Sequence, residues 1–162
     1  MPTLSKFDPI DSLEDNYLSL TYATLIAKGD ESSDTTAFKI TALSNGTLYL
    51  KDNLAPGIPL IQITTTSVAS GVWINASGVT INNVLYSTSS KSLIWVPISN
   101  TVGTPWSAFS VKAATGVNGT LSSSDVAVTV SLTSVNDAPS GTNKTITVVE
   151  DVYRAPLRPP PE

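Results

Sequence analysis

Carboxylates are the side chains of this chain whose type and spacing could carry out chemistry. The 162 residues include 13 aspartates and glutamates but no histidine and no cysteine. This composition excludes Ser-His-Asp and Cys-His catalysis and the usual zinc sites. The carboxylates gather at three places: Glu14-Asp15, the run from Asp30 to Asp34, and the late stretch that holds Asn136-Asp137 and Glu150-Asp151.

Paired carboxylates can work as a general acid and a general base when they flank a substrate. Glu14 and Asp15 are neighbours in the sequence, and adjacent residues of an extended strand point to opposite faces. They would therefore not face one bond of a substrate together. No other acid pair has a suitable spacing, and we expect a protein that is not an enzyme.

Calcium binding is the second chemistry open to carboxylates, because Ca²⁺ takes about six to eight oxygen ligands. One candidate group combines Asn136, Asp137 and Glu150. Glu14 and Asp15 are expected at the far end of the same domain, so they could join such a site only if they came from a neighbouring copy. The other is the loop with Asp30, Glu31 and Asp34. That loop lacks the Asp-x-Asp-x-Asp-Gly spacing, so a solvated loop stays an open alternative.

Most of the chain has residue patterns typical of β-strands, and these strands must position the carboxylates. Asn45-Gly46 predicts a hairpin from Ala37 to Lys51, because both central positions of a type I′ turn need positive φ. A single helical turn ended by Gly29 is the most helix we expect. Further strands are predicted in the ranges 4–13, 17–22, 60–65, 71–75, 79–86, 92–97, 106–113 and 125–132.

The opening of the sequence recurs near its end. Pro2 precedes a stretch that reaches Glu14-Asp15, and Pro139 precedes one that reaches Glu150-Asp151. The acidic pairs give a period of 150 − 14 = 136 residues, with the proline displaced by one position. We therefore expect one domain over residues 1–137 and the first strand of a following repeat over 138–151. The proline-rich tail 152–162 is read as a vector-derived scar or a polyproline linker.

The composition limits the classes of partner that the chain is expected to bind. Charged residues make up only 14% of the chain, and the net charge is −4. There is no basic stripe to neutralise phosphates, so nucleic-acid binding is not expected. No apolar run approaches the ~20 residues that span a bilayer, so membrane insertion is not expected either, and any export signal would lie elsewhere in a parent protein. Surfaces rich in Ser, Thr, Asn and Gly favour an extracellular protein.

Three stretches resemble a known family: Asn45-Gly46-Thr47-Leu48-Tyr49-Leu50, Leu93-Ile94-Trp95-Val96-Pro97 and Val135-Asn136-Asp137-Ala138-Pro139. Their order and spacing are similar to the cadherin-like, immunoglobulin-like tandem repeats of large bacterial surface adhesins, of the RTX-type or VCBS-like kind. The resemblance implies an all-β Greek-key sandwich of seven to nine strands that extends a cell-surface protein in cell adhesion. Its partners would be neighbouring repeats, often with calcium at the joints. Lys112-Ala113-Ala114-Thr115-Gly116 departs from the pattern, because it offers no carboxylate.

A recognition role is the competing hypothesis. The segment from Ala69 to Ser90 is longer than such repeats usually carry, and it holds Trp73, Asn75 and Tyr86 as candidate contacts for a glycan or a protein. The alternative for Trp73 is that it covers the open end of the sandwich, since large aromatic residues are commonly buried.

Overall fold

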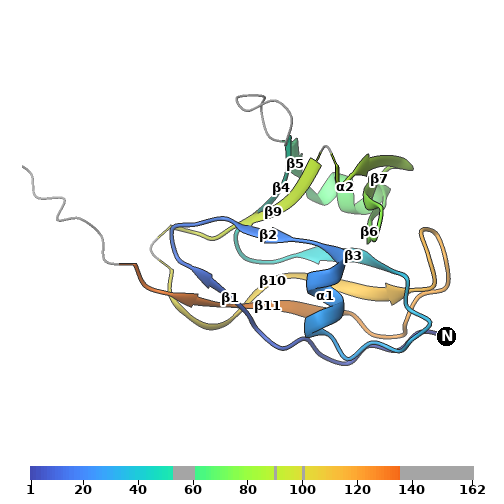
Figure 1. Cartoon of the computed structure of the whole chain (residues 1–162), viewed down its shortest axis with the longest axis horizontal. Helices are drawn as coiled ribbons and strands as arrows, with labels where there is room; N and C mark the ends of the chain where they lie inside the picture. The colour runs from blue at the N-terminus through green and yellow to red at the C-terminus, as the bar shows by residue number, and fades with distance from the viewer. Residues whose placement is uncertain (53–60, 90, 100, 136–162) are drawn as a thin grey trace, which may run out of the picture.

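The described chain forms two β-sheets with few helical residues, an all-β arrangement of the sandwich type (Figure 1). The structure is a computed structural model that describes residues 1–52, 61–89, 91–99 and 101–135. Its seven-stranded sheet has the order β1-β11-β10-β3-β6-β7-β8 and its four-stranded sheet the order β2-β9-β4-β5. The bounds of the large-sheet strands are β1 Ile10–Leu13, β3 Ala37–Leu43, β6 Val72–Asn75, β7 Gly78–Ile81, β8 Val84–Ser87, β10 Gly103–Ala114 and β11 Val126–Thr133. Those of the small sheet are β2 Leu18–Leu20, β4 Thr47–Asp52, β5 Ile61–Ile63 and β9 Lys91–Val96.

The hydrophobic core lies between the two sheets. It joins Phe38, Phe109 and Val128 of the large sheet to Leu50 and Trp95 of the small sheet. Strand β11 follows the predicted alternation, with Val126, Val128, Val130 and Leu132 buried on one face. The buried face of β10 likewise carries Phe109, Val111 and Ala113, as predicted. The period-2 pattern therefore identified these inner faces correctly.

The predicted hairpin from Ala37 to Lys51 is wrong. Strand β3 belongs to the large sheet and β4 to the small sheet, so Asn45-Gly46 carries the chain from one sheet to the other. The Asn45 side-chain amide donates to the Ser107 carbonyl, and the Asn45 carbonyl accepts from Trp95 Nε1 at 2.8 Å. Only Gly46 of the pair has positive φ. The side-chain amide and the carbonyl of Asn45 therefore bond to Ser107 and Trp95, which are distant in sequence, instead of closing a local turn.

Segment 61–89 holds more structure than predicted. Instead of two or three strands it contains β5 to β8, together with helix α2 (Thr65–Ser70). The stretch predicted as one strand, 79–86, contains a turn at Asn82 and Asn83, both at positive φ, so it divides between β7 and β8. The eleven strands of the described chain therefore exceed the seven to nine expected.

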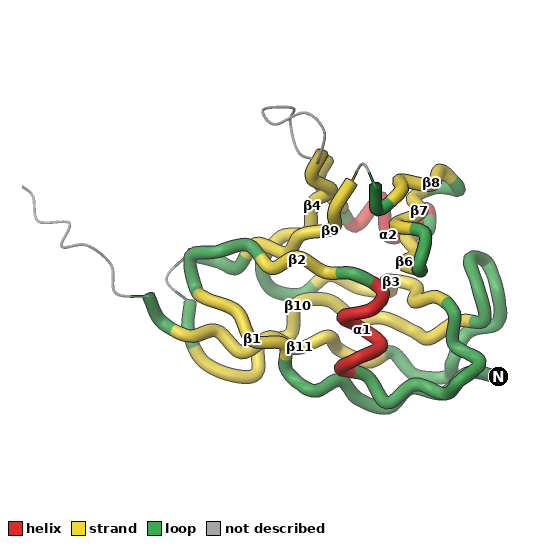
Figure 2. Tube along the Cα trace, viewed as in Figure 1, coloured by secondary structure: helices red, strands yellow, loops and turns green. Residues whose placement is uncertain are grey.

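Both helices are short (Figure 2). Helix α1 (Tyr22–Lys28) has seven residues, more than the single turn expected, because the Thr24 N–H donates to the Thr21 hydroxyl at its start and Leu25 is buried. It ends at Gly29, as predicted, whose N–H donates to the Leu25 carbonyl at 2.8 Å.

Candidate functional site

The first and last strands of the described chain lie side by side and run parallel. Strand β1 forms the edge of the large sheet, with Ile10 opposite Val130 and Leu13 opposite Thr133 of β11. The N-terminus and the last described residues nevertheless lie at opposite ends of the molecule (Figure 1). The incoming and outgoing segments of the chain therefore meet in one ladder of hydrogen bonds.

Glu14 closes this ladder. Its N–H donates to the Thr133 carbonyl at 3.0 Å, and its Oε1 accepts from the Val135 N–H at 2.8 Å. Only 6% of Glu14 is exposed, so this charge-assisted hydrogen bond is shielded from water. Asp15, its neighbour, is exposed. Glu14 was expected at the far end of the domain from the joint, whose residues 136 and 137 lie outside the described residues. The parallel pairing instead brings Glu14 next to Val135, just after the end of β11.

Asp30 holds the N-terminal segment that leads into β1. Its Oδ1 accepts from the backbone N–H groups of Ser5 at 2.8 Å and Lys6 at 3.0 Å. These backbone hydrogen bonds lower the pKa of the Asp30 carboxyl from its usual value, because they favour the charged form. A bridge between Phe7 and Gly29 continues the contact, and Leu4 and Phe7 are buried.

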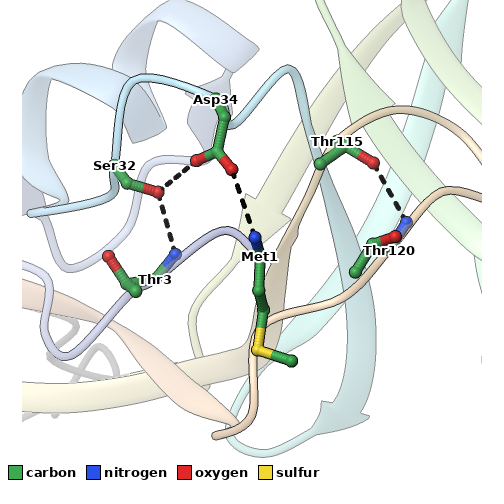
Figure 3. A network of polar contacts seen from close by, with 6 residues as sticks. All are labelled: Met1, Thr3, Ser32, Asp34, Thr115 and Thr120. Atoms are coloured by element: carbon green, nitrogen blue, oxygen red, sulfur yellow. Dashed lines mark hydrogen bonds and ion pairs between the residues drawn. The ribbon is translucent and has the colours of Figure 1, made fainter.

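Asp34 does the same for the first residues of the chain (Figure 3). Its carboxylate accepts from the Ser32 hydroxyl and lies 3.7 Å from the N-terminal amine of Met1. The Ser32 hydroxyl in turn accepts from the Thr3 N–H at 2.9 Å. The hydrogen bond from Ser32 is the main cause that lowers the pKa of Asp34. Both predicted loop carboxylates thus bind segment 1–6.

Glu31 differs from its neighbours because it points inward. Its Oε2 is buried without a hydrogen-bond partner and lies in the space beside Gly29 and Phe7. Burial raises the pKa of the Glu31 carboxyl, and the charge of Asp30 adds to the rise. Burial also raises the pKa of Tyr22, with a further contribution from Glu31, and the Tyr22 hydroxyl donates to the Thr35 carbonyl at 2.9 Å.

The described carboxylates do not fit a calcium site. Among residues 1–52, 61–89, 91–99 and 101–135, no three acidic side chains come together in a group that could hold a metal ion. Glu14, Asp30 and Asp34 each bind backbone or hydroxyl groups of their own chain instead. Asn136, Asp137 and Glu150, the proposed joint ligands, lie outside the described residues, as do the expected second repeat and the tail.

The three candidate contact residues do not share one surface. Trp73 is 5% exposed and packs with Ala37, Ala114, Val117 and Leu121 on the outer side of the large sheet. The ammonium group of Lys39 lies 5.3 Å from the centre of its ring.

The other two candidate residues have local roles. Tyr86 pairs with Val79 and packs against the core, so it faces the opposite side of the sheet from Trp73. The Asn75 Oδ1 accepts from the N–H groups of Ser77 and Gly78, which shapes the turn between β6 and β7.

Three hollows in the described chain offer little to a ligand. The one between the sheets, bordered by Leu20, Asn75 and Leu93, has a volume of about 70 Å³, well below the ~300 Å³ of small ligand pockets. Two wider hollows of about 280 and 380 Å³ adjoin at Leu43 and Thr65 beside helix α2. Their lining contains no charged side chain and no aromatic ring, so it lacks groups for acid–base chemistry or ring stacking.

Comparisons with protein-family models, with curated proteins and with solved structures each found no significant match. Neither helix in the described part of the chain has the length and apolar character needed to cross a bilayer.

Sequence reasoning did not find the pairing of the two terminal strands or the hydrogen bonds that Glu14 and Asp30 make beside them. The available signal was the placement of scarce carboxylates: Glu14 directly after one terminal strand, and Asp30 directly after the glycine that ends α1. Such residues commonly cap free backbone N–H groups. Which N–H groups they reach depends on the pairing of β1 with β11, which is a contact between residues about 120 positions apart.

Proposed function

We propose that this chain is a structural spacer domain of a secreted cell-surface adhesin, and that it carries pulling force from one end to the other. The observation that carries the proposal is the parallel pairing of β1 with β11 between chain ends that lie at opposite ends of the molecule. The partners in this role are neighbouring repeats of the same chain, and no enzymatic step is involved.

Parallel pairing of the terminal strands loads the ladder in shear. Tension that separates the two ends pulls β1 and β11 in opposite directions along their common axis. The hydrogen bonds from Ile10–Val130 to Leu13–Thr133, together with the Glu14–Val135 bond, must then break together. A ladder opened from one end would lose its bonds one after another, at a much smaller force.

The N-terminal segment adds to the resistance. Before tension reaches β1, it must pull Leu4 and Phe7 out of the core and break the hydrogen bonds from Ser5 and Lys6 to Asp30. Burial of each large apolar side chain contributes about 1.5–3 kcal/mol. The force-bearing unit is therefore segment 2–14 as a whole, held by β11 on one side and by the loop 28–34 on the other.

Strand order supports an immunoglobulin-like Greek-key sandwich. The small sheet places β2, β9 and β4 in the order of strands B, E and D of that fold, and the large sheet places β3, β10 and β11 in the order of strands C, F and G. Residues 61–89 then form an insertion that adds β5 to the small sheet and β6, β7 and β8 to the large sheet. The added strands of the large sheet lie at the edge opposite β1.

Single-molecule pulling through two alternative attachments tests the proposal. The chain has no cysteine, so one cysteine placed at Asn16, in the turn after β1, gives a unique handle. Force applied between Met1 and the C-terminus loads β1 and β11 in shear. Force applied between residue 16 and the C-terminus peels β1 from β11, since residue 16 and Val135, the last described residue, both lie beside the end of β1. We expect a severalfold higher unfolding force for the first geometry.

Equal unfolding forces in the two geometries would contradict the proposed role. The same protein serves as its own control, because only the handle moves. Asn16→Cys lies at an exposed turn position, and its melting temperature must match that of the original chain.

The recognition alternative receives little support from segment 69–90. Trp73 is covered, Tyr86 faces the core and Asn75 holds a turn, so they do not present one ligand surface. Calcium at the joint through Asn136, Asp137 and Glu150 stays a prediction. A rise in melting temperature with millimolar calcium, removed by Asp137→Asn, would support it.

A further inference from the structure

Four large apolar side chains are exposed at the end where the described chain leaves the domain. The exposed fractions are 43% for Leu13, 54% for Ile98, 45% for Val102 and 37% for Val135. We call these four residues the C-terminal patch. They come from three segments: the end of β1, the connection between β9 and β10, and the residues after β11.

Strand pairing brings the three segments together. Thr133 of β11 lies opposite Leu13 of β1, and the neighbouring Leu132 lies opposite Gly103, the first residue of β10. Val102 and Leu13 therefore flank the end of β11 on its two sides. Val135 follows two residues later and is held beside β1 by Glu14. The chain thus leaves the domain through the middle of its own apolar surface.

The sequence limits what can cover this surface. The recurrence of the opening places the start of the next repeat at residue 138 or at Pro139, so at most the three residues 136–138 separate it from the last residue held by Glu14. Three residues and their flanking bonds reach about 13 Å at most. A domain that begins there is therefore held close to the C-terminal patch.

We propose that the C-terminal patch is the docking surface for the N-terminal end of the following repeat, and that apolar contact holds the joint between them. The inference rests on the spacer function proposed above. The N-terminal end of a following copy would present its first residues with the loops 30–36 and 115–121, where Val117 and Leu121 are partly exposed. Figure 3 shows these loops on either side of Met1.

The size of the patch agrees with a joint rather than with a tight complex. Four side chains exposed to this extent present on the order of 300 Å² of apolar surface, and contact from the other side would bring the total to about 600 Å². That total equals the lower limit of interfaces between domains of one chain. It would be weak between separate molecules, and the short link compensates by keeping the local concentration high.

A tandem protein tests the proposal: residues 1–138 followed directly by residues 2–162, so that the natural link joins two copies. Backbone ¹⁵N relaxation measures the rotational correlation time of each copy. Domains that dock tumble as one body, and we expect a correlation time about twice that of the single chain. Leu13→Ser with Val102→Ser in the first copy should return it toward the single-chain value.

The matched control replaces Val84 and Leu85 by serine in the first copy. These residues of the edge strand β8 are 53% and 52% exposed and lie outside the patch, so the correlation time should stay high. Melting curves verify that all variants remain folded. The proposal is overturned if the unsubstituted tandem tumbles as two independent bodies, if the patch variant tumbles like the control, or if joint tumbling appears only with calcium. The pulling experiment uses a single domain, so its outcome is independent of this one.

Discussion

Replacing Trp73 by alanine tests whether this residue supports the fold or contacts a ligand. Trp73 is 5% exposed, and an aromatic side chain of this size buries about 150–250 Å². At about 25 cal/mol per Å² the lost burial corresponds to about 4–6 kcal/mol. Val117 and Leu121 of one loop pack over Trp73, and this loop can partly collapse into the cavity that the substitution leaves. We therefore expect a loss of about 3 kcal/mol, at the lower end for Trp→Ala substitutions.

Urea and thermal denaturation followed by far-UV circular dichroism measure this loss. A change of about 3 kcal/mol should lower the melting temperature by roughly 10 °C in a domain of this size. Leu85→Ala is the matched control. Register places Leu85 on the same side of the large sheet as Trp73, but it is 52% exposed, so its effect should stay within about 0.5 kcal/mol.

The cation near the ring is tested separately. Lys39→Met removes the charge over Trp73 and keeps the packing of the aliphatic stem, so it should cost no more than about 1 kcal/mol. If Trp73→Ala changes the free energy of unfolding by less than about 1 kcal/mol, the assignment of Trp73 to a supporting cluster is refuted. The recognition hypothesis would then regain its best candidate.

Three further substitutions test the ends, the crossing between the sheets and the buried carboxyl. Glu14→Ala should lower the free energy of unfolding by about 2 kcal/mol in urea titrations, because it removes a shielded charge-assisted hydrogen bond. Asp11→Ala, which removes an exposed carboxylate of the preceding strand β1, should change it little. Gly46→Ala should cost about 3 kcal/mol in thermal melts, because φ is 74° and the added Cβ would lie 2.5 Å from a carbonyl oxygen of β9. The raised pKa of Glu31 means that its protonated form is favoured in the folded state: this stabilisation is complete below the unfolded pKa of 4.5 and is lost as pH rises through the folded pKa. The melting temperature should therefore rise through Glu31 as the pH falls from 7 toward 4.5, and Glu31→Gln should abolish that rise. An unchanged pH profile would contradict this role.

Local pattern predicted the inner faces of the strands but not which strands pair. The alternation of Val126, Val128 and Val130 identified a half-buried strand because burial of one face depends only on a period of two. Asn45-Gly46 gave a wrong prediction because its turn propensity reflects only neighbouring residues. The two flanking strands β3 and β4 pair with β10 and β9 instead of with each other. Burial of Trp95 and its hydrogen bond to Asn45 then fix the crossing between the sheets.

Composition limits the chemistry that this protein can carry out. Without histidine and cysteine, and with few charges, it left carboxylates as its only versatile groups, and its alternating apolar residues determined an all-β fold. Tertiary structure alone decided what those carboxylates do. The parallel pairing of β1 with β11 places Glu14 beside Val135, and the path of the N-terminal segment places Ser5 and Lys6 beside Asp30. Contacts between residues so far apart in sequence depend on the packing of the whole core, which no local pattern encodes.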